Sequence, residues 1–224
     1  MTTFRAELGR AAGHPAGQAV SAVWTHLAAV IGLNLVFAAA ALVTWALAAA
    51  GAVLPAVLVG VVLVGSGWGI LSDAAVQIIR GSAHVKVAGM AVAARRGIAL
   101  ALPYGAAVLA LQAALHMSPS GPGQWLRVSA VVTDLLVLGS LTVLLPAATA
   151  DLSVGCRAAA GRWSAAARGT GRRPIRTLET LAVAAAMVGV GLSVPLVALL
   201  IGPMLVATYA AVSFIAPDTA ADDA

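Results

Sequence analysis

Charged residues are scarce in this chain: they make up 9% of its 224 residues, while 61% are hydrophobic. A typical soluble domain has about 25% charged residues and about 45–50% apolar ones. A soluble fold needs charged side chains to cover its exterior, and this composition has too few of them. The scarcity of charge therefore excludes a soluble globular domain and predicts an integral membrane protein.

Cysteine and aromatic residues are also few. Cys156 is the one cysteine, so an intramolecular disulfide is excluded, and we expect a reduced thiol that faces the cytoplasm. Aromatic residues make up 4% of the chain. The small and aliphatic residues that dominate instead suit helices that pack closely together. The sequence has no GxxxxGK[ST], HExxH or CxxC motif, so no cofactor, metal site or redox centre is predicted.

Long apolar runs are the main feature that is present. A helix that crosses the hydrocarbon core needs about 20 apolar residues, and unbroken runs of this kind argue against the alternating pattern of a membrane β-barrel. One run, 178–215, is too long for a single span. It is expected to turn near residues 189–195, with Gly202-Pro203 as the alternative. The predicted fold is all-α: a polytopic transmembrane helix bundle of six spans over residues 23–215. The alternative is five spans with a re-entrant or interfacial C-terminal helix. The other four runs are 23–47, 53–70, 98–117 and 126–150.

Basic residues are distributed unevenly between the loops. Twelve of the 13 Lys and Arg residues fall in the N-terminal tail, 1–22, and in two linkers, 72–96 and 151–177. Arg127 alone lies on the opposite side of the six-span arrangement. By the positive-inside rule, the tail and both linkers are expected on the cytoplasmic side of a bacterial inner membrane. The acidic C-terminal tail, 216–224, has no basic residue and does not decide between five and six spans.

Five arginines lie close together in the second linker, within residues 161–176. Neither helix-turn-helix spacing nor zinc-finger cysteines accompany them, so nucleic acid is not an expected partner. Arginines in such a linker hold it at the cytoplasmic surface and contact anionic lipid headgroups, while an amphipathic helix there dips a tryptophan into the interface. The residues expected to contact headgroups are Arg162, Trp163, Arg168, Arg172, Arg173 and Arg176.

A few polar side chains fall inside the expected spans, where such groups are costly and often functional. A pair between Asp134 and His116 near the outer face would suit a proton- or cation-coupled carrier. The other interpretation is that these groups hydrogen-bond between helices or reach water at the interface. It is favoured because no span carries several of them in series. The candidates are Asp134, His116, His26, Asn34 and Gln112.

Two glycines four residues apart, Gly65 and Gly69, form a GxxxG spacing that allows close contact between helices. Ser66 between them would need a base to act as a nucleophile, and the sequence places no histidine beside it. We therefore interpret this stretch as a packing motif. The sequence predicts a protein that is not an enzyme.

Three stretches resemble the YesL-type family of small bacterial membrane proteins: WTHLAAVIGLNLVF, LLPAATADLSVGCRAAAGRW and LLIGPMLVATYAAVSF. Members of that family are often encoded beside carbohydrate ABC transporters and have no established biochemical activity. The resemblance implies a membrane protein associated with a transport system, and it supplies no catalytic residues.

The residues and the resemblance together predict a non-enzymatic accessory or structural component of the membrane. Its expected partners are the lipid bilayer, with anionic headgroups on the cytoplasmic side, and a membrane-protein partner or a second copy of the chain. The alternative function is a small-solute or ion-coupled carrier that uses Asp134 and His116.

Overall fold

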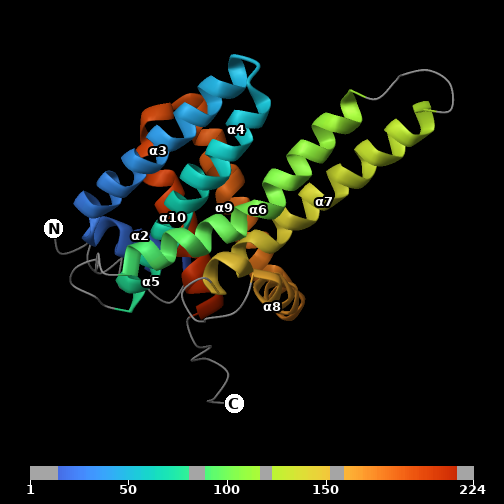
Figure 1. Cartoon of the computed structure of the whole chain (residues 1–224). Coiled ribbons are helices and arrows are strands. Elements are labelled where there is room, and N and C mark those ends of the chain that lie inside the picture. The colour runs from blue at the N-terminus through green and yellow to red at the C-terminus, as the bar shows by residue number, and fades with distance from the viewer. Residues whose placement is uncertain (1–14, 81–88, 117–122, 152–158, 216–224) are drawn as a thin grey trace.

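The computed structural model describes residues 15–80, 89–116, 123–151 and 159–215, and every element in these segments is helical (Figure 1). The all-α class predicted from the sequence is confirmed. The acidic tail 216–224 and Cys156 lie outside the described residues.

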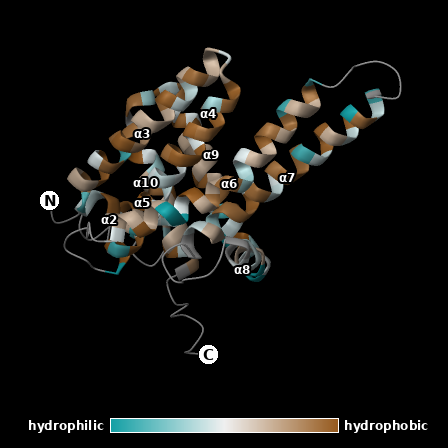
Figure 2. Ribbon diagram, in the orientation of Figure 1, coloured by the Kyte–Doolittle hydropathy of each residue, from teal (hydrophilic) through white to brown (hydrophobic). Residues whose placement is uncertain are grey.

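Five helical stretches are long and apolar enough to cross a membrane, so the chain is a multi-pass membrane protein. One of them is built from three consecutive elements: α4 (Val53–Val59), the π-helical η1 (Gly60–Val64) and α5 (Gly65–Ile79). Figure 2 shows apolar residues along much of the length of these helices. The other four are α3 (Leu27–Ala49), α6 (Met90–Leu115), α7 (Gly123–Asp151) and α9 (Pro174–Ser193).

A further helix, α10 (Pro195–Ile215), packs against α9 and runs back along it (Figure 1). The break between the two helices is at Val194, so the predicted turn near residues 189–195 is confirmed. The apolar part of α10, Ala198–Phe214, is shorter than the five long stretches. The count of six spans therefore stays a prediction.

Two short helices complete the described chain. The helix α8 (Ala159–Arg172) lies within the second linker, where the sequence predicts an amphipathic helix. The helix α2 (Pro15–Thr25) was not predicted, and it begins in the N-terminal tail and ends inside the apolar run 23–47. The first linker is also shorter than expected, because α5 continues to Ile79 and α6 begins at Met90. The reason is that the last turns of α5 are apolar on most sides and are buried in the core. The continuation was not predicted from hydropathy, because Ser72, Asp73 and Gln77 interrupt the apolar residues.

The main core lies at one end of the bundle, where α2, α5 and α10 meet. We call this the closed end and define it by its buried residues. In this core α10 is the central helix, since it also contacts α3, α7 and α9. The core residues are Val23, Val30, Leu71, Ala74, Ala75, Val76, Ile78, Met204, Ala207 and Ala211.

Glycines allow α5 and α6 to cross with their backbones in contact. A Cβ atom on Gly69 would overlap the Ala93 carbonyl oxygen, and a Cβ atom on Gly97 would overlap the Gly65 carbonyl oxygen. A Cβ atom on Gly65 would lie 2.8 Å from that of Ala101. The close contact predicted from the GxxxG spacing is therefore confirmed, with Gly97 as the residue across from it.

At the other end, α6 and α7 pack on each other as a hairpin that projects away from α3 and α4 (Figure 1). We call residues 105–115 and 123–139 the arm. Most of its large apolar side chains are exposed, from 38% at Val108 to 77% at Trp125. No residue in the most apolar 18-residue window of α7 is buried. The arm thus has little contact with the rest of the described chain.

Candidate functional site

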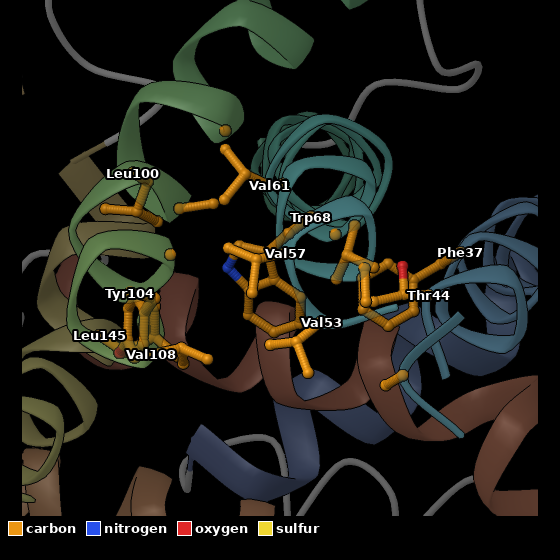
Figure 3. Close-up of a pocket in the computed structure, with 18 residues that line it drawn as sticks. Phe37, Thr44, Val53, Val57, Val61, Trp68, Leu100, Tyr104, Val108 and Leu145 are labelled. Atoms are coloured by element: carbon orange, nitrogen blue, oxygen red, sulfur yellow. The ribbon is translucent and has the colours of Figure 1, made fainter. Parts of the chain in front are cut away.

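An apolar groove of about 530 Å³ lies between α3, the α4–α5 stretch and α6 (Figure 3). None of the described residues that line it carries a charge. Phe37 and Trp68 meet on its wall with ring centroids 6.0 Å apart. The lining residues that Figure 3 labels are Phe37, Thr44, Val53, Val57, Val61, Trp68, Leu100, Tyr104, Val108 and Leu145.

Two of the polar side chains on the groove wall are hydrogen-bonded within the protein. Trp68 Nε1 donates to Thr149 Oγ1 on α7 (3.1 Å), and Thr44 Oγ1 donates to the Ala40 carbonyl oxygen on its own helix (2.9 Å). The groove therefore offers an apolar surface and suits a hydrocarbon group better than a charged solute.

The π-helical segment η1 supplies part of the groove wall through Gly60, Val61 and Val64. A π-helical turn inside an α-helix shifts the register of the side chains that follow, and such turns are frequent at functional sites. Thr44 Cγ2 would lie 3.0 Å from a Cβ atom on Gly60, so a larger residue there would press on α3.

A second hollow, of about 570 Å³, lies in the arm between α6 and α7. Asp134 lines it together with Ser129 and Thr133 of α7, and small side chains of α6 form the opposite wall. Asp134 is half-buried. Within the described residues, no hydrogen bond or ion pair engages its carboxylate. The α6 side chains are those of Ala110, Ala113 and Ala114.

Asp134 and His116 are not joined by a hydrogen bond or an ion pair in the part of the chain that the structure describes. His116 is exposed at the C-terminal cap of α6, where its Nδ1 donates to the Gln112 carbonyl oxygen (2.8 Å). Asp134 lies eleven residues into α7, or about 16 Å along the helix from its first residue. The pairing of these two groups that the carrier interpretation uses is therefore absent from the described residues, and His116 is not among the residues that line the hollow.

Asn34, another of the predicted polar candidates, is fully buried and connects α3 to α10. Its Nδ2 donates to the Leu200 carbonyl oxygen (2.8 Å), and its Oδ1 accepts from the Met204 backbone N–H (3.2 Å). These two backbone groups are four residues apart and would bond to each other in a regular α-helix. Asn34 thus forms the interhelical contact that the packing interpretation expects. His26, eight residues before Asn34, is half-buried at the break between α2 and α3.

The arginine-rich segment divides between α8 and the start of α9. Arg168 and Arg172 are exposed on α8, while the ring of Trp163 lies 6.2 Å from that of Tyr104 on α6 and packs against a small cluster around Leu100. Trp163 therefore contacts other parts of the protein, and its contact with lipid headgroups stays a prediction. The side chain of Arg162 lies outside the described residues.

Two further arginines take part in a polar cluster where α9 and α10 meet. Arg173 donates to the Ser213 carbonyl oxygen (3.1 Å), and Arg176 pairs with Glu179 (3.1 Å). Tyr209 of α10 donates its hydroxyl to the same Glu179 oxygen (3.1 Å).

Glu179 and Tyr209 were missed in the sequence. The three-residue spacing between Arg176 and Glu179 is a recognisable helical ion-pair signal. The contact between Glu179 and Tyr209 has no such signal in the sequence, because Tyr209 lies 30 residues further along the chain on another helix. Among the described residues no group of three or more His, Cys, Asp or Glu side chains is placed to hold a metal ion.

Comparison with known proteins gives no match to a family model, a curated protein or a solved structure.

Proposed function

We propose that this chain is a non-enzymatic accessory component of a bacterial inner membrane that assembles with a membrane-protein partner through its arm. The observation that carries this proposal is the arm itself, which projects from the end opposite the closed end and exposes apolar side chains on both of its helices. The resemblance to the YesL-type family, whose members are often encoded beside carbohydrate ABC transporters, agrees with an accessory role. In this proposal the closed end, with its arginines, faces the cytoplasm and anionic lipid headgroups.

A protein partner suits this arm for reasons other than its exposed apolar surface, which lipid alone could cover. Lipid satisfies exposed apolar side chains as well as protein does, so the association of helices in a membrane depends on close packing and polar contacts. The arm offers both, because its hollow is walled by alanines and contains a carboxylate.

Site-specific crosslinking in native membranes tests the proposal. In a Cys156→Ala background, a cysteine is placed at Leu126, which lines the arm's hollow and is 64% exposed, or at Val188 of α9, which is 67% exposed. We expect a discrete adduct with a second protein from Leu126→Cys and none from the Val188→Cys control. Adducts from neither position, or the same adducts from both, would contradict an assembly role for the arm.

A carrier that uses Asp134 is a second candidate, and the hollow that contains Asp134, Ser129 and Thr133 is the observation in its favour. Purified protein in sealed vesicles should then carry protons or cations, and Asp134→Asn should abolish the flux. No flux with the parent chain, or full flux with the variant, rejects the carrier.

A further inference from the structure

In a membrane that α7 spans, the Asp134 carboxylate lies within the hydrocarbon core. Trp125, near the start of α7, is 77% exposed and marks the outer end of the arm, where an aromatic side chain suits the interface. Asp134 follows it by nine residues, or about 13 Å along the helix, and precedes the buried Thr149 by about 22 Å. Neither end of α7 therefore brings this carboxylate to the membrane surface.

The arm itself does not neutralise that carboxylate. Within the described residues, Asp134 has no hydrogen bond or ion pair, and Arg127, the nearest cation along α7, lies seven residues or about 10 Å away. A carboxylate inside a membrane nearly always faces a bundle interior or a water-filled cavity and pairs with another group there, because its burial in hydrocarbon is costly. A group outside the described chain that complements its charge would remove this cost.

The surroundings of Asp134 suit the approach of another helix. Three alanines of α6 and Ala130 of α7 border the carboxylate, and small side chains allow helix backbones to come close. The hollow of about 570 Å³ accommodates a long side chain that reaches the carboxylate. Around it, Leu126 is 64% exposed and Val132 is 50% exposed, so apolar surface is available on either side.

We propose that the hollow around Asp134 is a docking site for a transmembrane helix of the partner protein, and that a lysine or arginine of this helix pairs with the Asp134 carboxylate. This inference rests on the proposed function and names the chemistry of the partner. A second copy of the chain is a poorer occupant. A two-fold axis along the membrane normal would place two Asp134 carboxylates at the same depth, where like charges repel.

A designed helix tests the pairing without knowledge of the natural partner. The probe is a transmembrane peptide of leucine and alanine with one lysine nine residues from its outer tryptophan, and its control has glutamine in place of lysine. Energy transfer between labelled peptide and labelled full-length protein in phosphatidylcholine vesicles reports binding. We expect the lysine peptide to bind about tenfold more tightly than the glutamine peptide, and Asp134→Asn to abolish the difference. Equal binding of both peptides, or a preference that survives Asp134→Asn, overturns the proposal.

A relocation variant tests the hollow as distinct from the charge. The double change Asp134→Leu and Leu135→Asp keeps the composition but turns the carboxylate about 100° around α7, away from the alanines. We expect this variant to lose the preference for lysine, while helix content measured by circular dichroism stays unchanged. A relocated carboxylate that binds the lysine peptide as tightly as the parent chain overturns the assignment to the hollow.

The outcomes separate this inference from the proposed function. Cellular adducts at Leu126→Cys that persist at the same yield with Asp134→Asn leave the assembly role standing and overturn the pairing. Specific binding of the lysine peptide without any cellular adduct supports the pairing and counts against the assembly role.

Discussion

Asn34 shows how one polar side chain inside a membrane helix is satisfied. Pro203 lies inside α10 and has no backbone N–H, and its ring crowds the carbonyl one turn earlier. Such a proline loosens the hydrogen bonds of the turn around it, and in membranes a neighbouring helix often bonds the freed groups. The Leu200 carbonyl and the Met204 N–H, which flank Pro203, both bond to Asn34. We infer that Asn34 compensates for Pro203.

A double-mutant cycle tests this compensation. Asn34→Leu in the parent chain removes both hydrogen bonds, and we expect it to lower the free energy of unfolding by about 1–2 kcal/mol. In a Pro203→Ala background, the Leu200 and Met204 groups can bond to each other, so the same substitution should cost clearly less. Unfolding in mild detergent, followed by circular dichroism, measures both values. The control is Ser140→Ala, because Ser140 bonds only to the Leu136 carbonyl of its own helix. Equal costs in the two backgrounds contradict the coupling.

Single residues were partly predictable from the sequence. Asn34 and Asp134 are conspicuous in the sequence because polar groups are rare within apolar runs. In the structure Asn34 bonds to α10, and Asp134 lines the hollow of the arm. Their surroundings were not predictable, because Leu200 is 166 residues from Asn34 along the chain and its carbonyl carries no side-chain signal. Glu179 lies in the long apolar run 178–215 and was not predicted as a functional residue, although Tyr209 and Arg176 both contact it.

At the scale of the helices, the crossing of α5 and α6 sets the geometry of the bundle. Gly65, Gly69 and Gly97 bring the two backbones together, and the arm leaves the bundle from this crossing. The groove residues Val61, Tyr104 and Gly105 follow on the side away from the closed end. The width of the groove therefore depends on how closely the two helices cross.

Gly97→Ala tests the importance of this contact. The added methyl group would overlap the Gly65 carbonyl oxygen and the Gly69 backbone, which no side-chain rotation relieves. We expect a loss of about 1–3 kcal/mol in the free energy of unfolding, as for other overpacked sites. Gly139→Ala on α7 is the matched control, because a Cβ atom there meets nothing within 4 Å. Since alanine is the better helix former, the control should be neutral or slightly stabilising. Equal unfolding midpoints for the two variants would show that the crossing tolerates a side chain.

The helices were predictable as elements, while their ends and contacts were less so. Hydropathy located the long helices and the break between α9 and α10, because hydrophobic length is set by the bilayer. The GxxxG spacing indicated one side of the α5–α6 contact but not Gly97 on the other. The extension of α5 to Ile79 was missed, because Ser72, Asp73 and Gln77 interrupt the apolar residues that are buried there.

At the scale of the whole molecule, the end of the bundle that contains the main core also carries most of the described basic residues. α2, α8 and the last turns of α5 and α10 lie at the closed end, together with exposed Arg168 and Arg172. The arm extends from the other end and carries Arg127. The splay of the arm was not predictable from hydropathy, since a helix that faces lipid and one that faces a groove have the same apolar composition.

Reporter fusions test the orientation that we propose. If α10 crosses the membrane, six crossings return the chain to the side where it began, and the basic closed end faces the cytoplasm. Green fluorescent protein fused after Ala224 should then fluoresce, whereas alkaline phosphatase inserted after Gly51, between α3 and α4, should be active in the periplasm. The Gly51 insertion serves as the control for the fusion after Ala224, because its side does not depend on α10. Alkaline phosphatase is also fused after Ala224 in place of the fluorescent protein. Its activity there, together with activity after Gly51, would mean that α10 does not cross and that the chain has five spans. Activity after Ala224 without activity at Gly51 would invert the proposed orientation and place the arginines of α8 outside the cell.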